Sequence, residues 1–305
     1  SVQCLCKLLI SPVVWWKHSL VRIWNRETTS SNSTDPFIPA DCILLNYQLK
    51  VMLRSRKRYL LNRLFIIQIF VSLLPASDRE KLIMSSSSVN FSSIEFEVIA
   101  KGESNNRFIW LHGDEQTANL AIRHHLKHYD GTAFLVKSKE REVPYRDTKI
   151  DPNRIFSRSG SFKAIKKFKP EWAPGTIKVA LDELDQNRNQ FLTKLFPDSG
   201  GVLIAVHNNF RGYNLKSELE NSTKVSLNPK ENPRDFIICT DPDDFEKLSV
   251  GTYNVVLQDR PPEKDNGSLS WAAFRNGIRY VNVETRLGWL SKQKKMLEFV
   301  EESLQ

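Results

Sequence analysis

Two kinds of apolar pattern alternate along the chain from Phe91 onward. Short apolar runs bounded by Gly, Pro, Asn or Asp predict strands, whereas apolar residues spaced three and four positions apart predict helices. We expect strands at 94–100, 108–111, 133–136, 202–206, 235–239, 253–257 and 279–284. We expect helices at 117–129, 179–196, 268–275 and 290–303.

Strands that alternate with helices predict an α/β fold, a three-layer α/β/α sandwich around a mixed, largely parallel sheet. The strand at 94–100 alternates in polarity and is expected at the edge of this sheet. Functional sites in such sheets lie at the carboxyl ends of the strands. We therefore expect residues 91–305 to form one domain, with its functional site at that edge.

Residues 1–90 lack this regular pattern and are expected to be an N-terminal extension. A basic cluster at 54–58 precedes an apolar run at 64–76, an order typical of a secretory signal peptide. If Met52–Ala76 acts as a signal, the protein is exported; if translation starts at Met84, it is cytoplasmic and Ser85–Ser88 is a flexible start. A disordered extension and a small helical domain are the other interpretations, and membrane contact is expected only through this segment.

The basic charge of the chain belongs mainly to the extension. The formal net charge is +9, but residues 1–83 carry 12 Lys and Arg against 5 Asp and Glu, while residues 84–305 carry 32 against 30. The nearly neutral part from residue 84 onward does not predict a phosphate-binding surface, so we expect no nucleic-acid partner. Cys239 is the single cysteine beyond residue 83, so no disulfide within this part is expected.

Two histidines and a glutamate stand where strands are predicted to end. His112-Gly113-Asp114-Glu115 follows the apolar run 108–111, and His207 follows the run 201–206. Two histidines and a carboxylate are a sufficient protein ligand set for a catalytic zinc ion, which keeps one position open for water. His112, Glu115 and His207 are therefore the predicted metal ligands.

Two further motifs suit the same site. Asn153 and Arg154 place an amide beside a guanidinium, which can grip a planar carboxylate by charge-assisted hydrogen bonds. Glu284 ends the strand predicted at 279–284, and a carboxylate beside a metal site can accept a proton from water. Purely structural interpretations also exist. Asp151-Pro152-Asn153-Arg154 suits a turn, and Glu284 could be a paired structural carboxylate.

With these residues in this order, the chain resembles the zinc carboxypeptidase superfamily, and more narrowly a bacterial branch related to aspartoacylase and succinylglutamate desuccinylase. The resemblance covers roughly residues 94–303 and rests on four segments, LHGDEQTA, IDPNRIFSR, GVLIAVHNN and YVNVETRLG. It implies a zinc cofactor held by His112, Glu115 and His207, a carboxylate grip by Asn153 and Arg154, and Glu284 as general base. The family also uses an upstream arginine at the scissile carbonyl, for which Arg141 and Arg146 are both candidates. The tyrosine that caps the substrate in digestive carboxypeptidases has no counterpart that we can place.

Three functions fit these features. The first is a carboxypeptidase that removes a C-terminal residue from a peptide. The second is an aspartoacylase-type deacylase of acylated amino acids, and the third is a binding protein with an inactive peptidase fold. The expected partner is thus a peptide or acylated amino acid with a free carboxylate. His124 and His128 lie one helical turn apart, but without a suitably spaced carboxylate we interpret them as a solvated helix face.

Overall fold

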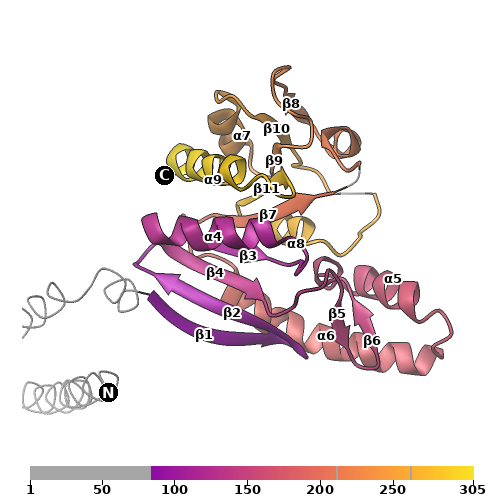
Figure 1. Ribbon diagram of the computed structural model, residues 1–305. Helices are drawn as coiled ribbons and strands as arrows, with labels where there is room; N and C mark the ends of the chain where they lie inside the picture. The colour runs from indigo at the N-terminus through magenta and orange to yellow at the C-terminus, as the bar shows by residue number, and fades with distance from the viewer. Residues whose placement is uncertain (1–83, 211, 262) are drawn as a thin grey trace, which may run out of the picture. The chain divides into compact units, whose positions relative to one another are not determined.

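The runs predicted as strands lie side by side in one mixed sheet in the computed structural model, which describes residues 84–210, 212–261 and 263–305 (Figure 1). Within these ranges nine strands pair in the order β1-β2-β4-β3-β7-β11-β9-β10-β8. Their bounds are β1 Met84–Phe91, β2 Ile94–Lys101, β3 Arg107–Trp110, β4 Gly131–Val136, β7 Leu203–Asn209, β8 Lys224–Ser226, β9 Phe236–Cys239, β10 Asn254–Leu257 and β11 Tyr280–Arg286. Two further strands, β5 Val143–Tyr145 and β6 Thr148–Ile150, form a separate antiparallel hairpin.

The centre of the sheet is parallel. Strands β4, β3, β7 and β11 run in one direction, while antiparallel pairs occur at β1–β2, β2–β4, β11–β9 and β10–β8. Helices cover both faces of the sheet, so every residue of the central strands β7 and β9 is buried, and β7 is apolar from Leu203 to Val206. The predicted mixed α/β sheet is confirmed.

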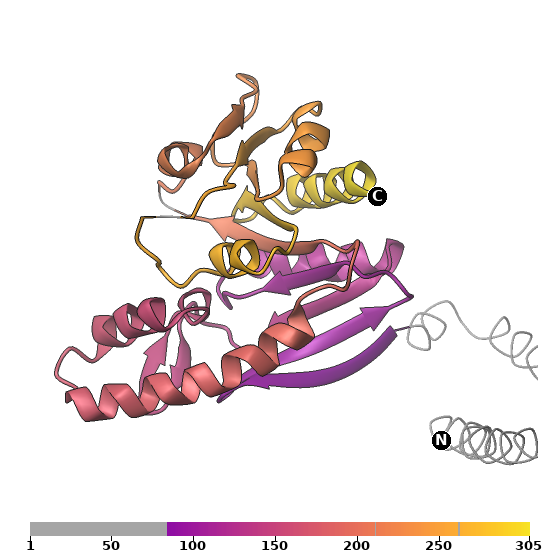
Figure 2. The same ribbon diagram turned by 180° about the vertical axis from the view of Figure 1, so that it is seen from behind.

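Helices cover both faces of the sheet. Helices α4 (Gln116–His128), α7 (Pro242–Ser249) and α9 (Leu290–Leu304) lie on one face (Figure 1). Helices α6 (Pro174–Leu195) and α8 (Leu269–Arg275) lie on the other, and α5 (Arg158–Phe168) packs against α6 (Figure 2). None of the helices in the described part of the chain is long and apolar enough to cross a membrane.

The amphipathic pattern accounts for how these helices pack. In α4 the side chains of Ala118, Ala121, Ile122 and Leu126 are fully buried at helical spacing. The predicted helices at 117–129, 268–275 and 290–303 agree with α4, α8 and α9 to within a residue at each end. Helix α6 begins five residues earlier than predicted, at Pro174, because a proline at the first helical position satisfies the geometry of a helix start.

The start of the sheet corrects the expectation for residues 84–90. Met84–Phe91 form β1, which pairs with β2 from Met84 opposite Lys101 to Phe91 opposite Ile94. Ser85–Ser88 are therefore strand residues, and β2 is an interior strand of the sheet. The serines hide this strand from a search for apolar patterns. Backbone hydrogen bonds to β2 and the buried side chains of Val89 and Phe91 hold it in place. The predictions for residues 1–83 lie outside the described residues.

Candidate active site

A tight turn after β3 brings His112 and Glu115 together. The backbone N–H of Glu115 donates to the carbonyl of His112 at 3.1 Å, and Glu115 immediately precedes α4. Gly113 is required in this turn, since a Cβ there would lie 2.4 Å from the carbonyl oxygen of Ser138. Its N–H donates to the carbonyl of Glu140 at 3.0 Å, so the segment that carries Arg141 packs directly on the turn.

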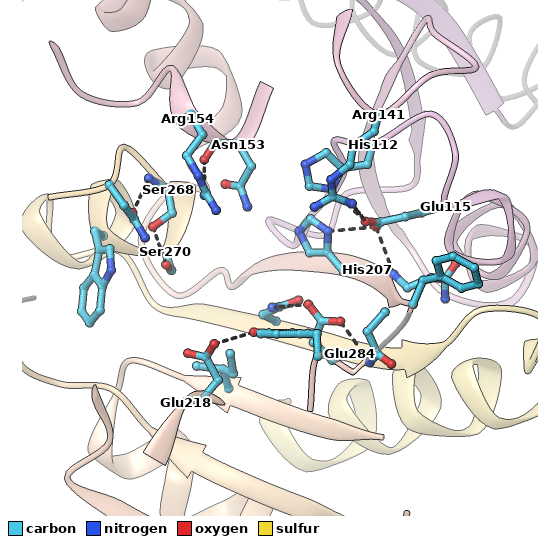
Figure 3. A pocket seen from close by; sticks show the side chains of 18 of the residues that line it. His112, Glu115, Arg141, Asn153, Arg154, His207, Glu218, Ser268, Ser270 and Glu284 are labelled. Carbon is cyan, nitrogen blue, oxygen red and sulfur yellow. Dashed lines mark hydrogen bonds and ion pairs between the residues drawn. The ribbon is translucent and has the colours of Figure 1, made fainter. Parts of the chain in front are cut away.

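His112, Glu115 and His207 form a buried cluster (Figure 3). His112 Nδ1 lies 2.8 Å from Glu115 Oε1, and His207 Nδ1 lies 3.0 Å from Glu115 Oε2. One nitrogen or oxygen of each residue falls within 4.8 Å of the others. Zinc takes imidazole nitrogen and carboxylate oxygen at about 2.0–2.2 Å, so three such donors facing one point fit a metal site.

Asp151 orients the first of these histidines, a role that the sequence patterns did not reveal. Its Oδ1 lies 2.9 Å from His112 Nε2 and also accepts the backbone N–H of Asn153 at 2.8 Å. A carboxylate on the far nitrogen of a ligating histidine sets the ring's tautomer and direction. His112 Nδ1 is thereby left to face Glu115 and the candidate metal position.

The histidines and carboxylates of this cluster stabilise each other's charged forms. Burial lowers the pKa of His112, but Glu115 and Asp151 outweigh burial and raise this pKa to about 9. Burial likewise acts to raise the pKa of Glu115, yet His207 and His112 hold it well below its usual range. Glu115 is therefore a carboxylate at neutral pH, the form that binds a metal ion.

Two amide side chains hold the His207 end of the cluster in place. The backbone N–H of Asn208 donates to Glu115 Oε2 at 3.0 Å, and the Asn208 side-chain oxygen accepts the N–H of Ala118 at 2.8 Å. Gln293 of α9, which is fully buried, donates to the carbonyl of His207 at 2.9 Å and accepts from Asn208 at 2.9 Å. No sequence motif indicated Asn208 or Gln293 as supports, because their roles depend on packing between α4, β7 and α9.

Glu284 lies on β11, directly opposite His207 on β7. Its carboxylate accepts weak hydrogen bonds from Asn282 Nδ2 at 3.3 Å and Asn209 Nδ2 at 3.4 Å. Burial raises the pKa of Glu284, and this effect outweighs the attraction of His207. A carboxylate with a raised pKa beside a metal site is suited to accept a proton near neutral pH.

Asn153 and Arg154 lie in a short 3₁₀ turn, Pro152–Arg154, that faces the same pocket. The Asn153 side-chain oxygen accepts the N–H of Leu269 at 2.9 Å, which leaves the amide NH₂ as its donor group. Arg154 Nη1 donates to the carbonyl of Asn153 at 2.8 Å. Figure 3 shows both side chains on the same side of the pocket, opposite Glu284.

The structure separates the two candidate arginines. Arg141 lines the pocket and its Nη1 lies 2.8 Å from Glu115 Oε1. Arg146 lies in the turn between β5 and β6, with a positive φ of 51°, and pairs with Glu183. Arg146 does not line the pocket, so of the two predicted residues only Arg141 accompanies the other site residues.

A pocket of about 710 Å³ is lined by all of the predicted site residues except Arg146. The histidines on α4 behave differently: His124 and His128 lie on its outer side with their rings 4.8 Å apart, while His125 is buried and pairs with Glu301. None of the three joins a candidate metal cluster within the described residues.

No protein-family model matches the chain, and no curated protein sequence matches it. Similar solved structures include a “putative metallopeptidase” from Shewanella baltica OS155, 13% identical with a TM-score of 0.41 over 74% of this chain and 89% of that one. Another of that description, from Shewanella amazonensis SB2B, is 16% identical with a TM-score of 0.38 over 78% and 91%. An aspartoacylase family protein from Mesorhizobium loti MAFF303099 is 11% identical with a TM-score of 0.35 over 72% and 60%. The function is therefore inferred from the geometry of the site.

Proposed function

We propose that this chain is a zinc-dependent hydrolase that cleaves an amide bond next to a free carboxylate, acting on peptides as a carboxypeptidase. One observation carries the proposal: a buried His–Glu–His set shares a single pocket with a lone carboxylate and an Asn–Arg pair. A structural ion-pair cluster would need neither the Asn–Arg pair nor Glu284 beside it.

His112, Glu115 and His207 would hold the zinc ion. When bound, zinc acts as a Lewis acid toward water and toward the scissile carbonyl. The chain's own contribution is a pre-set ligand geometry, because Asp151 and the backbone N–H of Asn208 already fix the direction of His112 and Glu115.

Glu284 is the proposed general base. Its buried carboxylate accepts the proton of the attacking water and afterwards delivers a proton to the nitrogen of the leaving amine. Amide nitrogens of Asn282 and Asn209 steady the carboxylate, and no Lys, Arg or His within the described residues forms an ion pair with it. This leaves its lone pairs available for proton transfer.

The three polar donors orient the substrate. Arg154 and the Asn153 NH₂ group bind the terminal carboxylate, because an arginine fork and an adjacent amide match its oxygen atoms. Arg141 lies beside Glu115 and stabilises negative charge that develops on the carbonyl oxygen. Holding the carboxylate at one fixed place determines which amide bond is cleaved.

The test uses the full chain loaded with zinc and two kinds of substrate, N-acylated dipeptides and N-acetyl amino acids. Release of the C-terminal amino acid from the dipeptides, abolished by a chelator and restored by zinc, is the expected result. Release of acetate from acetyl amino acids with intact dipeptides would replace the peptidase with a deacylase. Zinc binding without either reaction would leave a binding protein.

A further inference from the structure

The pocket has a second polar end, distinct from the metal ligands. We call it the distal end and define it by Tyr213, Glu218, Gln258 and Asn282, all of which line the pocket. Figure 3 shows Glu218 on the side of Glu284 that is away from the metal ligands. Tyr213, Glu218 and Gln258 have no role in the proposed hydrolysis, and Asn282 uses only its amide nitrogen there, so the presence of this polar group in the pocket requires another explanation.

Glu218 is a carboxylate without a cationic partner. The Tyr213 hydroxyl donates to its Oε1 at 2.6 Å and Gln258 Nε2 donates to its Oε2 at 2.7 Å. In the part of the chain that the structure describes, no Lys, Arg or His forms a salt bridge with it. Two neutral donors therefore hold the carboxylate in one orientation while its charge stays uncompensated.

Asn282 supplies an independent sign of a missing ligand. Its side chain is only 8% exposed, and its Oδ1 is one of two buried side-chain atoms, within the described residues, that have no hydrogen-bond partner. Asn282 Nδ2 donates to Glu284, which fixes the direction of the amide. A buried acceptor without a donor costs about 1–3 kcal/mol, so a donor supplied by a ligand would relieve that cost.

The distal end is therefore rich in hydrogen-bond acceptors. The O–H of Tyr213 and one N–H of Gln258 already donate to Glu218, whereas Glu218 and Asn282 Oδ1 can both accept more. Ile238 and Trp271 add apolar surface to the same pocket. An aliphatic chain that ends in a positively charged nitrogen matches this combination, since its stem packs on apolar walls and its head donates hydrogen bonds.

We propose that the distal end binds the ammonium or guanidinium group of a basic side chain, so that the substrate class is peptides ending in lysine, arginine or a similar diamino acid. This inference rests on the proposed function, in which Asn153 and Arg154 hold the carboxylate of the same terminal residue. One residue then spans the pocket, with its carboxylate at Arg154 and its charged nitrogen at Glu218.

The first test measures binding alone, by calorimetry on the zinc-loaded full chain with free L-lysine and L-norleucine. The two amino acids differ only in the terminal ammonium, so their carboxylate, α-amino group and stem contribute equally. Lysine should bind about 10–100-fold more tightly, the range for a hydrogen bond to a charged group. Equal or tighter binding of norleucine would overturn the proposal, and this comparison needs no variant to fold.

The second test identifies the residue responsible. Glu218→Gln keeps the size of the side chain and removes its charge, so the lysine-to-norleucine affinity ratio should fall to about one. Glu220→Gln is the matched control, because Glu220 is exposed on the same segment and does not line the pocket. A lysine preference that survives in a folded Glu218→Gln variant would remove Glu218 from the subsite.

Turnover separates this inference from the proposed function. On N-benzoylglycyl dipeptides, the zinc-loaded chain should favour lysine over norleucine as the terminal residue, with kcat/KM about 10–100-fold higher. If neither dipeptide is cleaved while lysine binding still depends on Glu218, the hydrolase proposal fails and the cationic subsite stands. If both dipeptides are cleaved equally well, the hydrolase stands and the subsite fails.

Discussion

Glu284 and His207 are register partners on adjacent parallel strands, β11 and β7. Side chains at paired positions of neighbouring strands point to the same face of a sheet, so the ladder itself sets the separation of the proposed base from a proposed metal ligand. A shift of one residue in this register would turn one of the two side chains to the opposite face. The proposed base and the proposed ligand therefore stand on two paired central strands of the sheet.

Glu284→Gln should retain zinc and lose most of its turnover. Glutamine preserves the shape and hydrogen-bonding capacity of the side chain but cannot accept the proton of water, so kcat should fall about 10²–10⁴-fold. Metal content by elemental analysis and kcat on an N-acylated dipeptide check both parts. Glu302→Gln, an exposed substitution on α9, should leave both unchanged. A Glu284→Gln variant with normal turnover would remove the base assignment.

His112→Ala should abolish stoichiometric zinc binding, because it removes one of the three proposed ligands. The full chain should bind about one zinc ion, which should raise the free energy of unfolding by about 2.7 kcal/mol at free zinc 100 times the Kd. Thermal unfolding with and without zinc measures this shift. His124→Ala, on the outer side of α4, is the control and should keep both the metal and the shift.

Asp151→Asn should weaken zinc binding without removing it. Asparagine lacks the negative charge that raises the basicity of His112, so affinity should drop about 10–100-fold, as for other carboxylates behind ligating histidines. Competition with a fluorescent zinc chelator gives the affinity. An unchanged affinity would mean that the 2.9 Å contact with His112 does not influence the metal.

Zinc binding should strengthen as the pH rises. In the metal-free chain Glu115 and Asp151, against the effect of burial, raise the pKa of His112 from 6.5 to about 9, so near neutral pH zinc must displace a proton. Affinity should increase about tenfold per pH unit and level off near the raised pKa. The stability of the metal-free fold changes with pH in the opposite direction. Protonated His112 stabilises the fold fully below pH 6.5, and this stabilisation is lost as the pH rises through about 9. Calorimetry in buffers of different ionisation enthalpy would count the released proton, and no release would contradict the assignment.

Arg154→Ala should weaken the binding of substrates that carry a free carboxylate. Loss of a charge-assisted hydrogen bond should lower kcat/KM about 10–100-fold, chiefly through KM. Arg146→Ala is the matched control, because Arg146 pairs with Glu183 outside the pocket and should leave the kinetics unchanged. If both variants keep the parental kcat/KM, the Asn153–Arg154 motif is only a turn.

The sequence patterns predicted the fold class and most of its elements because apolar spacing records which face of an element is buried. They failed where backbone pairing or local polarity decides the structure. The serine-rich strand β1 and the hairpin of β5 and β6 have too few apolar residues to be recognised, and α5 was not predicted. Helix α7 was not among the predicted helices either, although Asp241 caps its start by accepting the N–H groups of Asp243 and Asp244.

The site was predictable where a motif is local and obscure where contacts join distant segments. His112 and Glu115 are three residues apart, so one turn explains their meeting, and strand ends suggested His207 and Glu284. Arg141 and Arg146 could not be separated without the hairpin that holds Arg146 away. Gln293 is 86 positions from the His207 carbonyl that it contacts, and no spacing rule connects them.

Under the proposed function, the hydrogen bond from Leu269 to Asn153 would also determine which peptides are protected from this pocket. Because the N–H of Leu269 holds the oxygen of Asn153, the NH₂ group is the side that Asn153 offers to a ligand, and arginine has no acceptor at all. A peptide that ends in a carboxamide would bring its own N–H groups against these donors. C-terminal amidation should therefore shield a peptide, and interior bonds of long chains should be spared for the same reason.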